Sequence, residues 1–399
     1  MTNNNLLSRG MAAVLVAQFL SALADNALLF AAIAMLREHD APSWQTPLLQ
    51  AFFVVAFVLL APFVGPFADT WSKGRVMLAA NGMKFVGAAA MLGGLHPLLA
   101  YGLAGIGAAA YSPAKYGILS ELVNKDKLVK ANGMIEGSTI IAILLGAVLG
   151  GKLADISPST ALVTISGCYL LAAAANLLIP KLPPAHPLTH FSPDILFRDF
   201  WVAVKVLFNN RDARFSLLGT SVFWGAGSTL RLLLVAWVPI ALGIADLSMP
   251  ANMSGAVAIG IAFGAIAAAS FVTLDKVNRA LPAGMLLGVV ILVFAQVTNL
   301  YVALGLLVIL GLCGGFYVVP LNALLQERGH ETVGAGHAVA VQNFVENLVM
   351  LSLVGLYTFM DKSGMPVVQS ASIFGTVVLT AIAVLAWYRL NSRSPERQK

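Results

Sequence analysis

Two charges of opposite sign occupy corresponding places in the sequence. Asp25 lies in the middle of one apolar run, and Arg231 lies in the middle of another, 206 residues later. A charge at the centre of a membrane-spanning helix costs at least about 2.5–3.5 kcal/mol, so it is kept where it is paired, solvated or needed. The guanidinium of arginine is a planar fork of donors that suits a phosphate group. We therefore place these residues first among the candidates for binding a ligand.

Two interpretations of Asp25 and Arg231 remain open. Arg231 could bind a phosphate while Asp25 holds it in place, or the two could form a structural ion pair that locks one conformation. Both hold if a substrate competes for the pair. Residues at helical spacing share one face, or stripe, of a helix with each charge. Gln18 and Ser21 share the stripe of Asp25, and Trp224 and Ser228 share the stripe of Arg231.

Lys115 is a possible second phosphate contact. It follows Tyr111 and Pro113, and a proline inside a helix favours a kink that could aim Lys115 at a cavity. Lys115 also lies near the end of its apolar run, where its ammonium could instead extend to the membrane surface. The sequence leaves both interpretations open.

Two acidic residues, Glu136 and Glu346, lie early in later apolar runs. They could carry protons or bind an amine, or they could cap a helix and pair with basic loops. The polar neighbours Gln342 and Asn343 favour a cavity position for Glu346.

A conformational latch is predicted at one membrane surface. Asp69, Lys73, Arg75 and Glu121 lie at the ends of neighbouring apolar runs, where they could form a cluster of ion pairs without contacting substrate. Lys84, in the run that follows Arg75, is expected to snorkel to the surface.

The composition requires a membrane around these residues. Hydrophobic residues make up 59% of the 399 residues and charged residues 11%, whereas soluble chains hold about 45–50% and about 25%. The net charge of +6 fits basic cytoplasmic loops better than nucleic-acid binding. Cys168 and Cys313 lie inside apolar runs and are expected to be free thiols.

The expected fold is an all-α membrane protein with twelve transmembrane helices in two pseudo-symmetric six-helix halves. The halves are residues 1–180 and 214–399, joined by a proline-rich cytoplasmic linker at 181–213. Apolar runs that could span the roughly 30 Å hydrocarbon layer lie at 11–36, 47–68, 76–95, 97–119, 132–153, 160–180, 214–243, 252–273, 280–297, 300–325, 335–360 and 366–388.

Basic residues set the expected orientation. With both termini in the cytoplasm, the inner segments hold 18 of the 24 Lys and Arg residues, and the outer loops hold Arg37, Lys152 and Lys362. The spacing of 206 residues recurs between Asp69 and Asp275. Recurrent spacing with six helices per half predicts parallel repeats, and transporters of this kind bind substrate near the midplane between repeats.

Two motifs resemble known families. Residues 65–75, GPFADTWSKGR, resemble the loop signature of the major facilitator superfamily, although no basic residue directly follows Asp69. More specific blocks are similar to the bacterial lysophospholipid transporter family: QFLS and DNALLF within 18–30, GAAAYSPAKYGIL at 107–119, FWGAG and TLR within 223–231, and VVPLNALLQERG at 318–329.

The resemblance implies a monomeric flippase of the Gram-negative inner membrane. It would move lysophospholipids such as lysophosphatidylethanolamine and lysophosphatidylglycerol from the outer to the cytoplasmic leaflet. An acyltransferase coupled to an acyl-carrier-protein synthetase would then restore the second acyl chain. The ethanolamine of such a lipid could meet Asp25.

Other activities are less favoured. A proton-coupled multidrug exporter of the same fold, with Asp25, Glu136 or Glu346 as proton carrier, is the alternative. No GxxxxGK loop is present, so ATP and other cofactors are not expected. A membrane-embedded enzyme lacks a nucleophile–base or metal constellation, since His186 and His190 stand among prolines.

Overall fold

The computed structural model describes residues 8–123, 128–180, 192–333 and 335–391, and these ranges are all-helical. A helix covers each of the twelve expected apolar runs. The helices are α1 (Arg9–Glu38), α2 (Gln45–Thr70), α3 (Lys73–Leu92), α4 (Pro97–Leu122), α5 (Leu128–Ile156), α6 (Pro158–Leu177), α7 (Pro193–Asn209), α8 (Arg211–Leu242), α9 (Ser248–Phe271), the 3-10 helix η2 (Leu274–Ala280), α10 (Leu281–Phe294), α11 (Leu300–Thr332), α12 (Ala335–Lys362) and α13 (Val367–Asn391).

Ten helices within the described ranges are long and apolar enough to cross a membrane. The two expected spans outside this set are α3 and α4. The composition of α3 explains its lower hydropathy, because it carries Lys73, Arg75, Asn81 and Lys84. In α4 the small residues have a packing role. A side chain at Gly105, for example, would collide with the backbone of Phe53 in α2.

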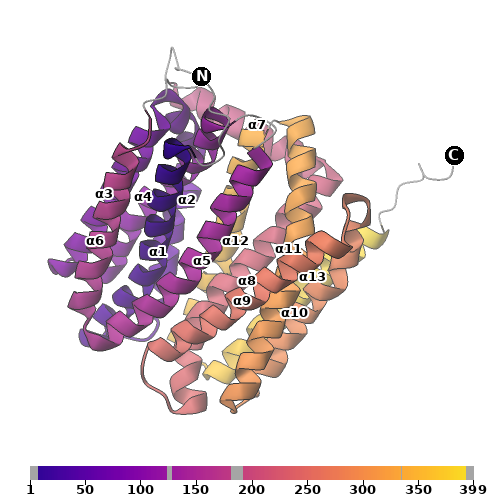
Figure 1. The fold of residues 1–399 in the computed structure, drawn as a ribbon. Coiled ribbons are helices and arrows are strands. Elements are labelled where there is room, and N and C mark those ends of the chain that lie inside the picture. Colours follow the sequence, from indigo (N-terminus) through magenta and orange to yellow (C-terminus); the bar gives the residue numbers. More distant parts are fainter. Residues whose placement is uncertain (1–7, 124–127, 181–191, 334, 392–399) are drawn as a thin grey trace.

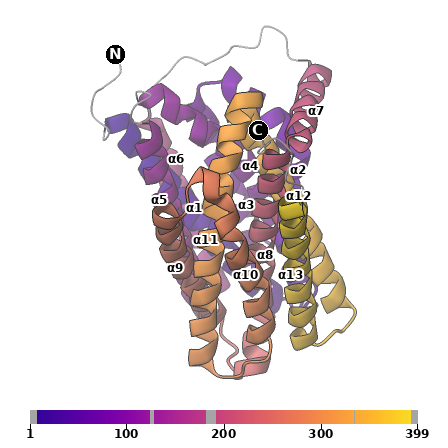
Figure 2. The ribbon, with the colours of Figure 1, turned by 90° about the vertical axis from the view of Figure 1, so that its right-hand side faces the viewer.

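The helices pack in two groups that follow the order of the chain. Within the first group, α1 packs on α5 and α6, α3 on α4 and α6, and α2 on α4. Within the second, α9 and α10 pack on α11, α8 on α11 and α12, and α13 on α10. The main contacts between the groups are α2 with α12 and α5 with α9. Figure 1 shows the first group in indigo to magenta beside the second in rose to orange and yellow, and Figure 2 shows the same bundle turned by 90° about the vertical axis.

Glycines bring α9 and α11 into backbone contact. A Cβ added to Gly260 or Gly264 of α9, or to Gly311 or Gly315 of α11, would lie closer than 3.0 Å to backbone atoms of the facing helix. Small residues at helix interfaces allow close approach and van der Waals packing in membranes. This pair is therefore the most tightly interlocked in the second group.

The helix α7 lies within the segment 181–213, which was expected to be a linker without a helix. Phe200, Ala203 and Leu207 repeat at helical spacing and form its buried face. That face belongs to a hydrophobic cluster shared with Ala61 of α2 and Val345 of α12. The helix therefore packs across the seam between the two groups, at the end of the bundle where α1 begins (Figure 1).

Candidate functional site

Asp25 is held inside the first group of helices. Its Oδ2 accepts a hydrogen bond from Lys84 Nζ of α3 at 2.7 Å, and this contact is also an ion pair. Its Oδ1 accepts a hydrogen bond from the hydroxyl of Tyr169 in α6 at 2.8 Å. Both carboxylate oxygens are thus satisfied by residues of α3 and α6.

Lys84 is buried, so the expectation that it snorkels to the surface is wrong. The residue is 1% exposed, and its stem passes the position of Gly107 in α4, where an added Cβ would lie 2.8 Å from Lys84 Cγ. Besides Asp25, its ammonium donates to Ser21 Oγ at 2.9 Å and lies 4.8 Å from the ring centroid of Tyr111. The ion pair with Asp25 in the interior stabilises the ammonium of Lys84 more than hydration at the membrane surface would.

Arg231 projects from the middle of α8 to α1, but its partner there is Asn26. Arg231 Nη1 donates to Asn26 Oδ1 at 3.1 Å. The amide of Asn26 is oriented because its Nδ2 donates to the carbonyl of Ala22 at 2.8 Å. Among the described residues, no carboxylate forms an ion pair with Arg231.

The predicted ion pair between Asp25 and Arg231 is therefore replaced by two separate contacts. Consecutive residues of an α-helix point about 100° apart around its axis, because one turn takes about 3.6 residues. Asp25 faces α3 and α6, whereas Asn26, the next residue, faces α8. The repeat spacing had placed Asp25 and Arg231 at corresponding heights, but it could not fix the rotation of α1.

The remaining residues of the two predicted stripes have different surroundings. Gln18 is buried and donates to Thr139 Oγ1 of α5 at 2.8 Å, and Ser21 donates to Asn81 Oδ1 of α3 at 2.7 Å. Trp224, two turns before Arg231 in α8, is 40% exposed. The Oγ of Ser228 is buried and has no hydrogen-bond partner among the described residues. The stripe on α8 thus combines an exposed indole, a hydroxyl without a partner and a guanidinium.

Glu346 belongs to a polar cluster between α11 and α12. Gln342 Nε2 lies 2.8 Å from both Glu346 Oε1 and Asn322 Oδ1, to which it donates. Asn343 contributes its backbone carbonyl, which accepts from Asn347 Nδ2 at 2.7 Å. Glu346 is buried and belongs to α12 of the second group, whereas the Asp25–Lys84 pair joins α1 and α3 of the first.

Two other candidates lie in the first group. Lys115 is buried, and its ammonium lies 4.3 Å from the ring centroid of Tyr116. Tyr111 is buried beside Lys84. The side chain of Glu136 lies outside the described part of the structure.

The predicted latch is described only in part. Lys73 is buried, with its Cε and Cδ against Gly117 of α4, and Arg75 is exposed. The side chains of Asp69 and Glu121 are outside the described residues, so the cluster stays a prediction.

A further contact between the groups, not expected from the sequence, lies at the other end of the bundle. Asp155, near the end of α5, accepts hydrogen bonds from the backbone amides of Leu247 at 2.6 Å and Ser248 at 2.8 Å. These amides are at the N-terminus of α9, where the N-cap residue Leu247 supplies no side-chain hydrogen bond. Arg37 Nη1 also donates to the carbonyl of Ala245 at 3.1 Å. A carboxylate from one group thus caps a helix of the other.

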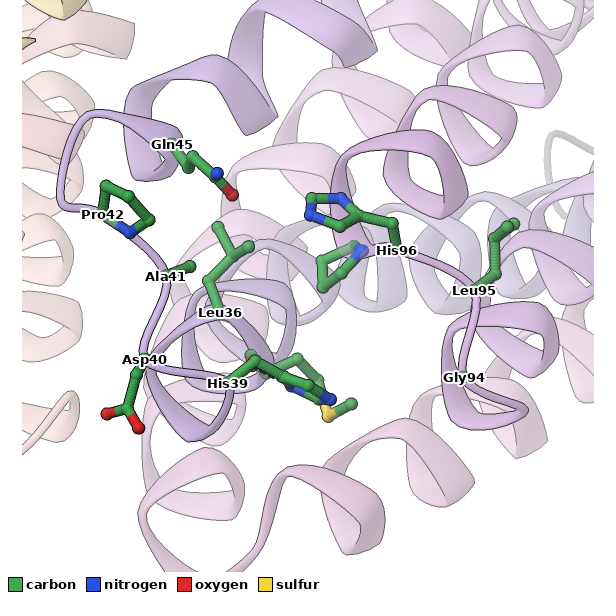
Figure 3. Close-up of a pocket in the computed structure, with 11 residues that line it drawn as sticks. Leu36, His39, Asp40, Ala41, Pro42, Gln45, Gly94, Leu95 and His96 are labelled. Carbon is green, nitrogen blue, oxygen red and sulfur yellow. Dashed lines mark hydrogen bonds between the residues drawn. The ribbon is translucent and has the colours of Figure 1, made fainter.

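A pocket of about 380 Å³ lies at this same end, between the turn from α1 to α2 and the turn from α3 to α4. Figure 3 shows His39, Asp40 and His96 around it. His39 Nδ1 lies 2.7 Å from the carbonyl of Met35, and His96 Nδ1 accepts from the amide of Leu98. The described lining residues include the acidic Asp40 and no Lys or Arg. An acidic lining disfavours phosphate, so we do not place an anionic headgroup here.

Lys84, Asn26 and Tyr169 are the site residues that sequence reasoning missed. Lys84 had a usable signal, since Asn81 precedes it by one helical turn and the two place polar groups on one face of α3. Asn26 and Tyr169 offered no such signal. Asparagine next to an aspartate, or tyrosine in an apolar helix, is common without a binding role.

The fold defines the class of protein. The family model of the Major Facilitator Superfamily matches residues 14–355. The solved structure of the nucleoside transporter NupG aligns over 96% of this chain and 99% of its own, with a TM-score of 0.72 and 12% identity. A POT family transporter in complex with 5-aminolevulinic acid aligns over 98% and 97%, with a TM-score of 0.76 and 11% identity. At these identities the likeness shows the fold alone.

Relatives with much higher identity narrow the class. A lysophospholipid transporter, LplT, of Klebsiella pneumoniae is 53% identical over 389 residues, covering 97% of this chain and 98% of the relative. The LplT of Escherichia fergusonii is 54% identical over the same coverage. The chain therefore belongs to the major facilitator superfamily and, within it, to the lysophospholipid transporter family.

Proposed function

We propose that this protein moves lysophospholipids from the outer to the cytoplasmic leaflet of a bacterial inner membrane, where they are reacylated. The observation that carries the proposal is Arg231, a guanidinium in the middle of α8 that is bonded to the neutral amide of Asn26. An arginine in an apolar bundle with no described carboxylate partner is a ready site for an anion. The names of the relatives at 53–54% identity support lysophospholipid as that anion's source.

The chemistry of a lysophospholipid suits this distribution of charge. Its phosphodiester needs one cationic contact, and its single acyl chain needs an apolar route. The exposed Trp224 stands two turns from Arg231 on the same face of α8 and offers an apolar surface to the acyl chain. The neutral Asp25–Lys84 pair adds no net charge on the other side of α1.

The alternative of a proton-coupled multidrug exporter receives less support. Asp25, one of its possible proton carriers, is occupied by Lys84 and Tyr169. A cationic drug would also be repelled by Arg231.

The proposed topology has twelve spans in two halves, α1 to α6 and α8 to α13. In it α3 and α4 also cross the membrane, shielded from lipid by neighbouring helices. Both termini would lie in the cytoplasm, as the excess of basic residues in the inner segments requires. The helix α7 would then lie at the cytoplasmic surface, and Asp155 at the periplasmic end. The chain would act as a monomer next to a reacylating enzyme, with no nucleic-acid partner.

The function is tested by uptake into proteoliposomes that contain the full-length protein. Fluorescent lysophosphatidylethanolamine is added outside, and albumin then extracts the lipid left in the outer leaflet. We expect a protected fraction that grows faster than in protein-free vesicles. A rate equal to that of protein-free vesicles would contradict the proposal, and uptake of a cationic dye but not of the lipid would favour the exporter.

The cap on α9 is expected to hold the periplasmic end of the transporter closed. Replacing Asp155 with alanine removes an acceptor shared by two amides, and a lost helix cap costs about 1 kcal/mol, which is roughly a five-fold shift between two states. Gly227 lies one turn before Arg231 in α8, and a Cβ added there meets no atom within 4 Å. A cysteine at Gly227, with Cys168 and Cys313 changed to serine, should react about five-fold faster with a membrane-impermeant maleimide added from the periplasmic side. Asp246→Ala is the matched control, since Asp246 accepts from the amide of Met249 at the same end of α9 but lies in the same group as that helix, so its loss removes no contact between the groups. Equal rates in the two variants would rule out a role for the cap.

A further inference from the structure

We infer that Lys84 is a positioning residue whose role is to hold Asp25 away from Arg231, which leaves Arg231 available for the lipid phosphate. The inference rests on the proposed function and concerns the same site. It assigns Asp25 and Lys84 to the control of Arg231, and it places neither of them on the substrate.

The geometry separates two charges that the chain brings close together. Asp25 and Asn26 are neighbours in α1, and Asn26 Oδ1 lies 3.1 Å from Arg231 Nη1. The carboxylate nevertheless faces the other way, because Lys84 at 2.7 Å and Tyr169 at 2.8 Å hold its two oxygens.

Lys84 is itself fixed, so it can act as a permanent counter-ion. Its ammonium donates to Ser21 Oγ at 2.9 Å as well as to Asp25, and the ring of Tyr111 covers it at 4.8 Å. Its side chain is 2% exposed, whereas that of Asp25 is 20% exposed. The lysine is therefore the shielded partner, and Asp25 is the one that could reach the space beside α1.

The consequence of losing Lys84 follows from the cost of an unpaired charge. A carboxylate in the interior that loses its partner is strongly destabilised and seeks another cation. Arg231, beside the next residue of α1, would supply it, and the two would form the ion pair that the repeat spacing predicts. Asp25 would then occupy the guanidinium fork and compete with the phosphate of the substrate.

The test uses three variants in the proteoliposome uptake assay: Lys84→Met, Lys84→Met combined with Asp25→Asn, and Lys84→Arg. The single Lys84→Met variant should raise KM for lysophosphatidylethanolamine about ten-fold or more, because substrate must displace a bound carboxylate. The double variant removes the competitor and should return KM to within about three-fold of wild type. Lys84→Arg keeps the counter-ion and should also remain within about three-fold.

The outcomes separate this inference from its alternatives. If Lys84 bound the phosphate directly, the double variant would keep the high KM, and the inference would be overturned. If Lys84 were only structural, Lys84→Met would lower Vmax and thermal stability at an unchanged KM, which also overturns it. If wild type moved no lysophospholipid, the proposed function would fail first. In that case, a double-mutant cycle of thermal stability in the Lys84→Met background would still test the inference, since the effects of Asp25→Asn and Arg231→Ala should be non-additive there and would be additive if the inference is wrong.

Discussion

Replacing Arg231 with alanine is expected to reduce lysophospholipid uptake to a few percent of the wild-type rate at low substrate concentration. Truncating one partner of an interior, hydrogen-bonded charge contact costs about 2–5 kcal/mol, which is roughly 30-fold or more in affinity. The loss should appear mainly as a higher KM, because the guanidinium would contact the phosphate in every state that holds the substrate.

Two further variants test whether the expected loss of uptake comes from the guanidinium of Arg231. Arg231→Lys keeps the charge but loses the planar fork, so an intermediate KM is expected. Arg214→Ala is the matched control, because Arg214 lies in the same helix and stacks over the ring of Tyr388 at 4.9 Å, far from Asn26. Its uptake should remain near wild type. Equal uptake by Arg231→Ala and wild type would remove Arg231 from the site.

Replacing Gly311 with alanine is expected to produce the largest loss of stability among single substitutions in the second group of helices. The added methyl group would overlap the carbonyl oxygen of Val257 and would lie 2.9 Å from the amide nitrogen of Ile261, both in the backbone of α9. A backbone atom within a helix cannot move aside as the end of a flexible side chain can. Overpacking costs about 1–3 kcal/mol and can cost more when the neighbour is rigid.

The same helix supplies the control for Gly311. Gly305 of α11 has no atom within 4 Å of an added Cβ, so Gly305→Ala should be neutral or slightly stabilising. The measurement is the thermal unfolding temperature in detergent, together with the yield of monodisperse protein. We expect a drop of several degrees for Gly311→Ala and none for Gly305→Ala. Equal unfolding temperatures would mean that α9 and α11 can separate without cost.

The length of each apolar run determined most of the fold. Every expected span is covered by a helix, because the hydrocarbon core demands that backbone hydrogen bonds be satisfied within the segment. The linker was less predictable. The prolines of 181–193 obscured the amphipathic pattern of Phe200, Ala203 and Leu207, which forms α7. Long family-like blocks identified the family, and relatives at 53–54% identity confirm it.

The sequence by itself placed Asp25 and Arg231 at corresponding positions, and tertiary structure decided that they do not pair. Spacing along the chain fixes the height of a residue in the membrane to within a turn, because each residue adds about 1.5 Å. It does not fix how a helix is rotated or which neighbour packs on each face. Those depend on α3 and α6, which bring Lys84 and Tyr169 to Asp25, and on α8, which brings Arg231 to Asn26. Because Asn26 and not Asp25 faces α8, the predicted ion pair is replaced by two contacts. The carboxylate of Asp25 is bonded to Lys84 and Tyr169, and the guanidinium of Arg231 is bonded to the neutral amide of Asn26.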